Sequence, residues 1–270
     1  MHLSKHHGLG NDFLVVLRDD VVPLSDDAAG ALAVRLCHRT RGVGADGLII
    51  GGPAVRRIAC DLQMWLFNAD GSRAEMSGNG IRCLAQAVIE KRGVTEATLM
   101  ISTDGGLRRV DIKATGPGEA WASVDMGSIV AAEPPAGWHR LDLDPSRPVA
   151  HVSIGNPHAV VLVDDADSVD LVVAGAAVPD INLEVIAAGP EAGAITMRVH
   201  ERGVGITEAC GTGACAAAWA ARDWGLVGTQ VVVHMLGGDG EVTLDGDSVT
   251  LAGPAVHIAD IEVPETEVTA

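Results

Sequence analysis

The sequence contains no tyrosine, only two phenylalanines and few basic residues. Lysine and arginine total 19 against 36 aspartates and glutamates, which gives a formal net charge of -17. Such a charge repels phosphate backbones and anionic lipids, so we expect neither a nucleic-acid partner nor a membrane partner. Because 47% of the residues are hydrophobic but only 3% are aromatic, the core is predicted to consist mainly of aliphatic side chains.

Long apolar runs and a cysteine framework are also missing. No run reaches the roughly 18 apolar residues typical of a membrane-spanning helix, and residues 1–7 lack the apolar segment of a signal peptide. The five cysteines are odd in number and lack the paired spacing of zinc ligands. We therefore expect reduced thiols, no metal site and a cytoplasmic protein.

A short pattern occurs twice, in each case directly before a helix of small residues. The first copy is Ser77-Gly78-Asn79-Gly80 and the second is Cys210-Gly211-Thr212-Gly213. A polar residue stands nine positions before each reactive side chain, namely Asn68 and Glu201. The repetition predicts two related halves that each contribute one group to a single site. A carbon held between two such groups can lose a proton to one and gain a proton from the other, which is the geometry of racemisation.

The rest of the sequence predicts short strands with three helices among them, not the regular alternation of a doubly wound fold. The helices are expected at about 25–39, 78–92 and 211–224, with an N-cap at Ser25 and a glycine after each of the other two. The strands are expected at 13–17, 47–50, 64–67, 98–101, 109–112, 122–126, 152–154, 159–163, 194–199 and 230–235, followed by a hairpin that turns at Asp245-Gly246. Turn-forming residues at 115–119 indicate a boundary between the halves.

Cys210 stands where a thiol meets unpaired backbone N–H groups and the positive end of a helix dipole, and both favour the thiolate. Gly211 and Gly213 allow a substrate carboxylate to approach those N–H groups closely. A lone cysteine in this position is usually a small buried apolar residue, but the repeated pattern favours a functional role. The segment Gly211–Ala216 also fits a dinucleotide fingerprint, although the strand and the later acidic residue that this fingerprint needs are missing.

Seven segments spread from about residue 6 to residue 260 resemble the diaminopimelate epimerase family, within the superfamily that includes proline racemase. They are His7–Phe13, Arg41–Gly47, Phe67–Ser72, Gly78–Cys83, Gly155–His158, Glu201–Gly203 and Ala209–Gly213. The resemblance implies an α+β fold of two pseudo-symmetric halves, each a curved sheet around a central helix, with the site in the cleft between them. The expected halves are residues 1–116, joined by a C-terminal strand at about 259–270, and residues 117–258.

The resemblance also implies a function: interconversion of LL- and meso-diaminopimelate in lysine and peptidoglycan precursor synthesis, without pyridoxal phosphate or any other cofactor. Cys210 would be the acid/base on one face of the α-carbon, and Ser77 occupies the position of the second catalytic group. His158 and Glu201 would adjust the pKa of the thiol. The substrate, a small amino acid, would be bound by Asn11, Asn68, Gly78, Asn79, Asn156, Asn182, Glu201, Arg202, Gly211 and Thr212. A homodimer is implied by the resemblance alone.

Ser77 departs from the family pattern, which has a cysteine at this position. A serine hydroxyl is a far weaker acid than a thiol, whose pKa is about 8.5. Three explanations stay open: a natural variant that still epimerises, altered chemistry such as one-sided proton transfer or water elimination, and an engineered substitution. Gly47 is a second departure, because some members carry a glutamine there, and Val178–Asn182 matches only loosely.

Other functions remain as alternatives to the epimerase. One is a racemase or dehydratase for another amino acid such as a hydroxyproline. Another is a cysteine hydrolase in which Cys210 is the nucleophile and His158 or His200 is the base. The third is a homologue that binds its ligand but has lost turnover through Ser77.

Overall fold

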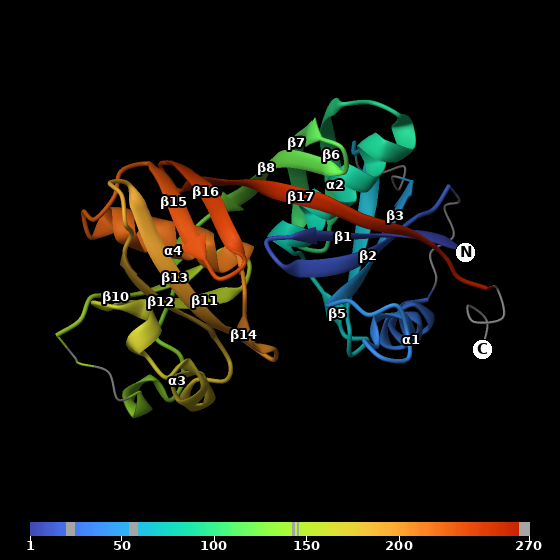
Figure 1. The fold of residues 1–270 in the computed structure, drawn as a ribbon. Helices are drawn as coiled ribbons and strands as arrows, with labels where there is room; N and C mark the ends of the chain where they lie inside the picture. The colour runs from blue at the N-terminus through green and yellow to red at the C-terminus, as the bar shows by residue number, and fades with distance from the viewer. Residues whose placement is uncertain (20–24, 54–58, 142–143, 145, 265–270) are drawn as a thin grey trace. The chain divides into compact units, whose positions relative to one another are not determined.

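The computed structural model describes residues 1–19, 25–53, 59–141, 144 and 146–264 (Figure 1). The chain forms two compact units, unit 1 from residues 1–124 with residues from 253 onward, and unit 2 from Asp125–Ala252. The sequence indicated boundaries near residues 116 and 258, whereas the units divide inside two continuous strands, β8 (Glu119–Ser128) and β17 (Ser248–Glu262). The strand β8 runs through the first division without a turn, and at the second division Gly253-Pro254 lie inside the continuous strand β17, so turn-forming residues do not locate these boundaries reliably. Residues 265–270 of the expected C-terminal strand lie outside the described residues.

Unit 1 is a ring of strands around one helix. The pairing order β1-β2-β3-β4-β6-β7-β8-β17 returns to β1, so the ring closes. Helix α2 (Gly78–Arg92) contacts strands on several sides of this ring, and every residue from Gly78 to Ile89 is buried. A helix that is buried all round is typical of one enclosed by other elements. The strands are β1 (His2–Gly8), β2 (Asn11–Leu17), β3 (Gly47–Pro53), β4 (Leu62–Asn68), β6 (Glu96–Thr103) and β7 (Gly106–Gly116), with the short β5 (Arg73–Ala74) beside β4.

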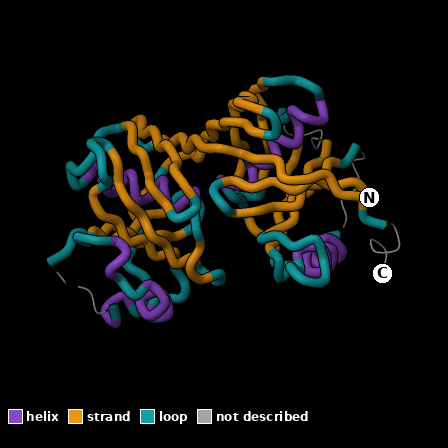
Figure 2. Tube along the Cα trace, in the orientation of Figure 1, coloured by secondary structure: helices purple, strands orange, loops and turns teal. Residues whose placement is uncertain are grey.

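Unit 2 repeats this plan with different strands. Helix α4 (Gly211–Asp223) contacts β10, β11, β12, β13, β15 and β16, and alanines supply most of its buried residues. Small side chains let the strands approach the helix axis closely, which suits an enclosed helix. Its strands are β9 (Val130–Ala131), β10 (Val149–Ser153), β11 (Pro157–Leu162), β12 (Asn182–Ala188), β13 (Ala194–Glu201), β14 (Gly205–Thr207), β15 (Gln230–Met235) and β16 (Gly238–Asp245). Strands predominate in both units (Figure 2).

The remaining helices pack outside the strands. Helix α1 (Asp26–Cys37) contacts β3 and β4, and its N-cap Ser25 accepts a hydrogen bond from the Ala28 N–H at 3.3 Å. Helix α3 (Leu171–Ala177) contacts β13 and β14. Two 3-10 turns, η1 (Trp138–Arg140) and η2 (Ala166–Ser168), complete the described elements.

The α+β class and the helix at the centre of each half are confirmed. The three expected helices and the expected strands are all present, and the hairpin turns at Asp245-Gly246, where Asp245 pairs with Ser248. The sequence did not predict β1, β12 or α3. Strands β1 and β12 carry polar residues at core-facing positions, and α3 is too short to show helical periodicity. No described helix combines the length and hydropathy that crossing a bilayer requires.

A polar network lies inside the core of unit 1. His6 is fully buried, and its Nδ1 and Nε2 lie 3.0 Å from Gln86 Oε1 and 2.8 Å from Ser4 Oγ. Its ring stacks on His257 at a centroid distance of 4.9 Å. A neutral ring satisfies both contacts, with Nδ1–H donating to Gln86 and Ser4 O–H donating to Nε2. Burial lowers the pKa of His6 to about 4.

The unfolding free energy is expected to fall as the pH drops from about 6.5 to about 4, because the unfolded chain protonates His6 in this window and the folded protein does not. The predicted loss is on the order of 3 kcal/mol. Urea unfolding across this range should show a shallower pH dependence for His6→Gln than for the unsubstituted protein. His2→Gln is the matched control, because that imidazole is exposed. Equal slopes for His6→Gln and the unsubstituted protein would contradict the assignment.

Candidate active site

The first half of the candidate site lies at the N-terminus of α2 in unit 1. Ser77 is the N-cap of this helix, and its Oγ accepts a hydrogen bond from the Gly80 N–H at 3.0 Å. Gly78 and Asn79 follow in the buried first turn. The Asn79 amide donates to Asn11 Oδ1 at 3.3 Å and accepts from Arg82 Nη2 at 2.7 Å. The helix start therefore brings Ser77, Gly78, Asn79 and Asn11 together.

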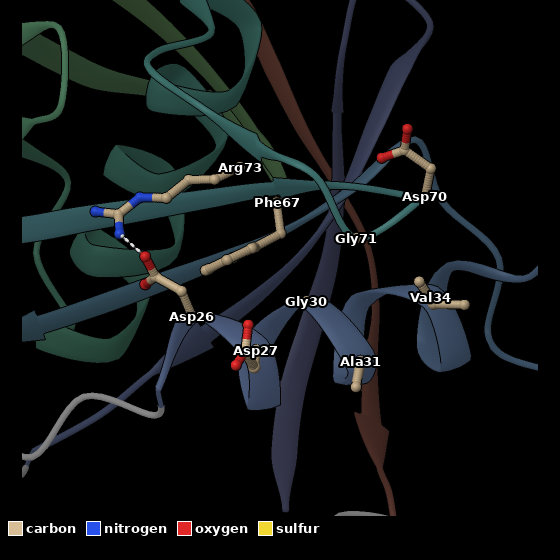
Figure 3. A pocket seen from close by; sticks show the side chains of 9 residues that line it. All are labelled: Asp26, Asp27, Gly30, Ala31, Val34, Phe67, Asp70, Gly71 and Arg73. Atoms are coloured by element: carbon tan, nitrogen blue, oxygen red, sulfur yellow. Dashed lines mark hydrogen bonds and ion pairs between the residues drawn. The ribbon is translucent and has the colours of Figure 1, made fainter.

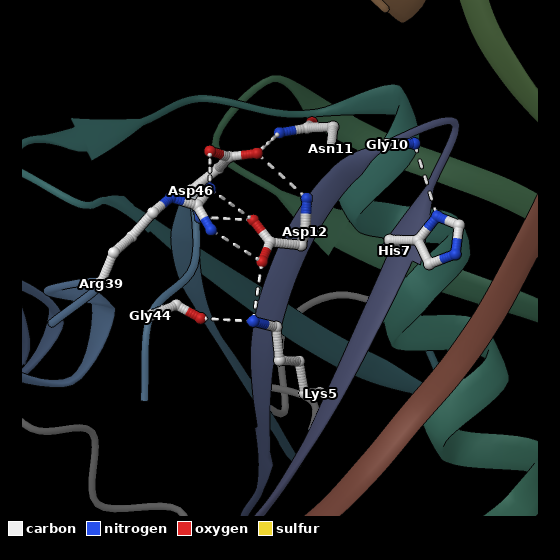
Figure 4. A network of polar contacts seen from close by, with 8 residues as sticks. All are labelled: Lys5, His7, Gly10, Asn11, Asp12, Arg39, Gly44 and Asp46. Carbon is white, nitrogen blue, oxygen red and sulfur yellow. Dashed lines mark hydrogen bonds and ion pairs between the residues drawn. The ribbon is translucent and has the colours of Figure 1, made fainter. Parts of the chain in front are cut away.

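A network of ion pairs holds Asn11 in place (Figure 4). Asp46 Oδ2 accepts from Asn11 Nδ2 at 2.7 Å and from the Asp12 N–H at 3.0 Å. Arg39 donates to both aspartates, and Lys5 Nζ lies 2.9 Å from Asp12 Oδ2. Burial acts to raise the pKa of Asp12, but the hydrogen bonds from Arg39 and Lys5 outweigh it and hold the pKa below its usual value. Because Asn11 Nδ2 donates to Asp46, its Oδ1 is the atom that faces Asn79.

Asn68 and Gly47 stand at the paired ends of β4 and β3. The Asn68 amide bonds within its own turn, where Nδ2 donates to Ser72 Oγ at 2.9 Å. A Cβ at Gly47 would lie 2.8 Å from the Phe67 carbonyl oxygen, so any side chain here would require the backbone to shift.

The second half of the site lies at the N-terminus of α4 in unit 2. Cys210 is the N-cap of this helix, and its Sγ accepts from the Gly213 N–H at 3.4 Å. Thr212 Oγ1 lies 3.5 Å from the same sulfur and accepts from Asn156 Nδ2 at 3.3 Å. Cys210, Gly211, Thr212 and Asn156 are thus brought together, as Ser77 and its neighbours are in unit 1.

His158 lies beneath Asn156 on β11. Its Nε2 is 3.0 Å from Asn156 Oδ1, and its Nδ1 is 2.7 Å from Glu184 Oε1. His158 and Glu184 are both fully buried. Sequence reasoning missed Glu184, although a single carboxylate within the apolar run of β12 is itself a signal, because an unpaired charge is rarely buried. His200, the other candidate base, lies where a Cβ on Gly175 of α3 would touch its ring, and it forms no hydrogen bond to Cys210 among the described residues.

Glu201, Asn182 and Arg202 surround the turn that follows β13. Burial raises the pKa of Glu201, whose Oε1 accepts a short hydrogen bond from Thr207 Oγ1. Asn182 is also buried, and it accepts from the Arg202 backbone N–H at 3.0 Å while donating to the Pro157 carbonyl at 2.9 Å. Asn182 therefore ties the turn to β11. The Arg202 side chain is exposed and forms no ion pair among the described residues.

The resting state of Cys210 differs from the thiolate expected at a helix N-terminus. Burial raises the pKa of this thiol well above its usual value, and the nearby carboxylates of Glu201 and Glu184 raise it further. The hydrogen bonds from Thr212 and from the Gly213 N–H oppose this effect without overcoming it. The positive end of the helix dipole is therefore too weak to lower the pKa of this thiol against burial and the two carboxylates. The uncharged thiol is favoured before substrate binds.

The two half-sites share a backbone plan but carry different charges. Arg82 stands five positions after Ser77 and is fully buried, whereas the position five residues after Cys210 is Cys215. Asn68 in unit 1 corresponds to Glu201 in unit 2. Among the described residues, the one hydrogen bond of Ser77 Oγ comes from the Gly80 N–H, so no base contacts this hydroxyl. The Ser77 hydroxyl can donate a proton, and the Cys210 thiol must lose its own proton before it can accept one from the substrate.

An open pocket of unit 1 lies between α1 and the turn after β4 (Figure 3). Asp26, Asp27, Phe67 and Arg73 are among the residues that line it, and Arg73 is already paired with Asp26 and with Asp104. None of the residues predicted for the site lines this pocket.

Comparison with known proteins agrees with this geometry. The family described as diaminopimelate epimerase matches residues 3–131 and 150–258. The chain is 36% identical to the diaminopimelate epimerase of Desulfitobacterium hafniense, over 96% of each protein, and 38% identical to that of Pelotomaculum thermopropionicum, over 98% of this chain and 99% of the relative. The chain belongs to the diaminopimelate epimerase family. It is therefore an isomerase of the epimerase type.

Solved structures share the fold at low sequence identity. A predicted epimerase from Pseudomonas aeruginosa superposes with a TM-score of 0.73 at 19% identity, covering 97% of this chain and 98% of the other. A probable proline racemase from Agrobacterium radiobacter gives a TM-score of 0.71 at 18% identity, covering 97% and 92%. These similarities show the shared fold, and the residue roles must come from the site itself.

Gly213→Ala is expected to damage the unit 2 half-site. The added Cβ would lie 2.6 Å from Glu184 Oε1 and 3.3 Å from Cys210 Sγ, and the buried carboxylate cannot swing into solvent. Overpacking of this kind costs about 1–3 kcal/mol, measurable by urea unfolding. The matched control is Gly80→Ala in unit 1, where the nearest atom is the flexible end of Ile49 at 3.0 Å. An equal loss of stability in both variants would show that contact with Glu184 is not the cause.

Proposed function

We propose that this epimerase interconverts LL- and meso-diaminopimelate without a cofactor, by acid/base proton transfer on both faces of the α-carbon. Cys210 acts on one face and Ser77 on the other. The observation that carries the proposal is the matched capping of the two enclosed helices, where Ser77 Oγ accepts from the Gly80 N–H and Cys210 Sγ accepts from the Gly213 N–H. Family membership supports the substrate, since the relatives from Desulfitobacterium hafniense and Pelotomaculum thermopropionicum, which match most of this chain, are diaminopimelate epimerases.

The helix N-termini are suited to stabilising the carbanion that forms when the α-proton leaves. The backbone of Gly78-Asn79 and of Gly211-Thr212 presents N–H groups to a substrate carboxylate, and the helix dipoles add positive potential. Donors arranged in advance stabilise developing charge without reorganising during the reaction. The exposed guanidinium of Arg202 is available to bind the distal carboxylate in a bidentate manner.

The difference between Ser77 and Cys210 has a kinetic consequence. When Cys210 acts as a thiolate it removes the α-proton, and the carbanion then takes the hydroxyl proton of Ser77. This leaves an alkoxide whose hydrogen-bond partner among the described residues is the Gly80 N–H, so it recovers its proton from solvent. Because forward and reverse reactions pass through the same state, the slow step limits interconversion in both directions. Solvent exchange through Cys210 alone does not involve Ser77 and is therefore expected to be faster than inversion.

The test is α-proton exchange in deuterated water, followed by NMR from LL- and from meso-diaminopimelate separately. We expect the isomer whose α-proton faces Cys210 to exchange this proton faster than it inverts. Cys210→Ala is expected to slow the exchange by about a hundredfold or more. Ser77→Cys is expected to raise the inversion rate in both directions by about tenfold or more while leaving the Cys210-dependent exchange little changed.

Two results would contradict the proposal. Full exchange in Cys210→Ala would remove Cys210 from the chemistry. Inversion by Ser77→Ala at the unaltered rate would show that Ser77 is not the second acid. A third arm uses hydroxyproline as substrate, and turnover of it in place of diaminopimelate would transfer the mechanism to another amino acid.

A cysteine hydrolase fits the geometry less well. The hydrolase requires a histidine base in contact with the nucleophile, but the ring nitrogens of His158 face Asn156 and Glu184. The hydrogen bonds of Cys210 Sγ involve Thr212, Gly213 and Glu201 instead. On the family resemblance we also propose a cytoplasmic homodimer. Light scattering of the purified protein tests the dimer.

A further inference from the structure

Glu184 is the most deeply buried carboxylate in the unit 2 half-site. It is fully buried, its Oε1 lies 2.7 Å from His158 Nδ1, and its Oε2 is buried with no hydrogen-bond partner among the described residues. A charged pair in this setting gives little or no net stability, because desolvation offsets the attraction between the charges. Because burying Glu184 costs desolvation free energy and leaves Oε2 without a partner among the described residues, a contribution to folding stability does not explain its presence.

The fold makes room for this carboxylate next to the reactive sulfur. Gly213 is the reason, because a Cβ there would lie 2.6 Å from Glu184 Oε1 and 3.3 Å from Cys210 Sγ. Parallel pairing of β11 with β12 places Val160 opposite Glu184, so His158 stands two residues before that partner on the same strand face. The position of Glu184 next to α4 is therefore set by three elements that are separated in the sequence, namely β11, β12 and α4.

A continuous chain of polar contacts leads from Glu184 to the sulfur. Glu184 contacts His158 Nδ1, His158 Nε2 contacts Asn156 Oδ1, and Asn156 Nδ2 contacts Thr212 Oγ1. Thr212 Oγ1 in turn lies 3.5 Å from Cys210 Sγ. Both ring nitrogens of His158 face acceptor oxygens, so a ring with hydrogens on both nitrogens would satisfy both contacts. Asn156 then donates to Thr212, which leaves the Thr212 hydroxyl hydrogen for the sulfur.

We propose that Glu184 is a positioning residue that sets the direction of this chain of hydrogen bonds, so that its last donor, the Thr212 hydroxyl, points at Cys210 Sγ. Without the carboxylate, His158 loses one ring hydrogen and its Nε2 becomes an acceptor. The Asn156 amide then turns to donate to His158, and Thr212 donates to Asn156 in place of the sulfur. The sulfur of Cys210 loses the donor that stabilises its thiolate.

The surrounding titratable groups make the direction of the effect testable. They are His158 on β11, Glu201 on β13, Cys210 at the start of α4 and Cys215 further along α4. Replacing Glu184 by glutamine removes one of the carboxylates that raise the pKa of Cys210, and the loss of a proton from His158 removes a positive charge that acts in the opposite direction. These two changes in charge oppose each other, whereas the loss of the Thr212 donor acts on the sulfur directly and favours the thiol over the thiolate.

The test is the pH dependence of Cys210 alkylation by iodoacetamide, resolved by peptide mass spectrometry in the full-length protein. Glu184→Gln is expected to shift the midpoint to higher pH by about one unit, which is about a tenfold lower rate at a fixed pH below the midpoint. In the exchange assay the same variant should lower kcat with little change in KM, because Glu184 does not touch the substrate. Glu191→Gln is the matched control, since Glu191 pairs with His234 at 2.9 Å on the surface of the same unit.

A midpoint that is the same in Glu184→Gln and in the control would overturn the inference. Nitrogen-15 shifts of His158 in the unsubstituted protein give a measurement that does not depend on the variant folding. Shifts of a doubly protonated ring support the proposed direction, and those of a ring with Nδ1 unprotonated contradict it.

The inference rests on the proposed function, because it takes Cys210 as the group that transfers the proton. The two can still fail separately. A shifted alkylation midpoint in a protein that does not exchange diaminopimelate supports the role of Glu184 and overturns the substrate. Normal exchange of diaminopimelate with an unshifted alkylation midpoint supports the substrate and overturns the role of Glu184.

Discussion

The enclosure of α2 and of α4 by strands is the constraint on which the rest of the structure depends. The first N–H groups of any helix lack partners within the helix, and inside a ring of strands water cannot supply them freely. Ser77 Oγ and Cys210 Sγ each satisfy one of these groups, and the neighbouring groups stay available to a carboxylate. The capping that makes each helix stable therefore also places a reactive side chain beside an anion-binding helix end.

The same enclosure explains why so much polar chemistry lies in the core. Arg82 and Gln86 are buried on α2 and His6 is buried beside it, and His158 and Glu184 are buried around α4. Each contributes to a network that fixes the orientation of an amide or an imidazole. In unit 1 the contact with Asp46 holds Asn11, and in unit 2 the contact with Glu184 holds His158. A low-dielectric surrounding makes such networks rigid, since a broken contact leaves a buried polar group unpaired.

The two half-sites also show how one plan is given two chemical characters. The first combines a neutral amide and a buried guanidinium around a serine, and the second combines buried carboxylates around a cysteine. Helix ends attract anions in both units, so substrate carboxylates suit either. The proton affinity of the capping side chain is what separates them, and it is set by neighbours from other strands rather than by the Gly-x-Gly segment.

The sequence by itself determined the features that rest on local chemistry. Capping, glycine spacing and apolar composition act within a few residues, and so Ser77, Cys210, the three longer helices and the turn at Asp245-Gly246 were predictable. Family membership was predictable from motifs such as Gly78–Cys83. The tertiary structure alone decided the rest. Glu184 meets His158 because β12 pairs with β11 across a long connection. Cys210 rests as a thiol because burial and the carboxylates of Glu201 and Glu184 raise its pKa more than the hydrogen bonds at the helix start lower it. The burial and the electrostatic surroundings of a side chain depend on several strands that come together only in the folded protein. For that reason a local sequence pattern does not predict them.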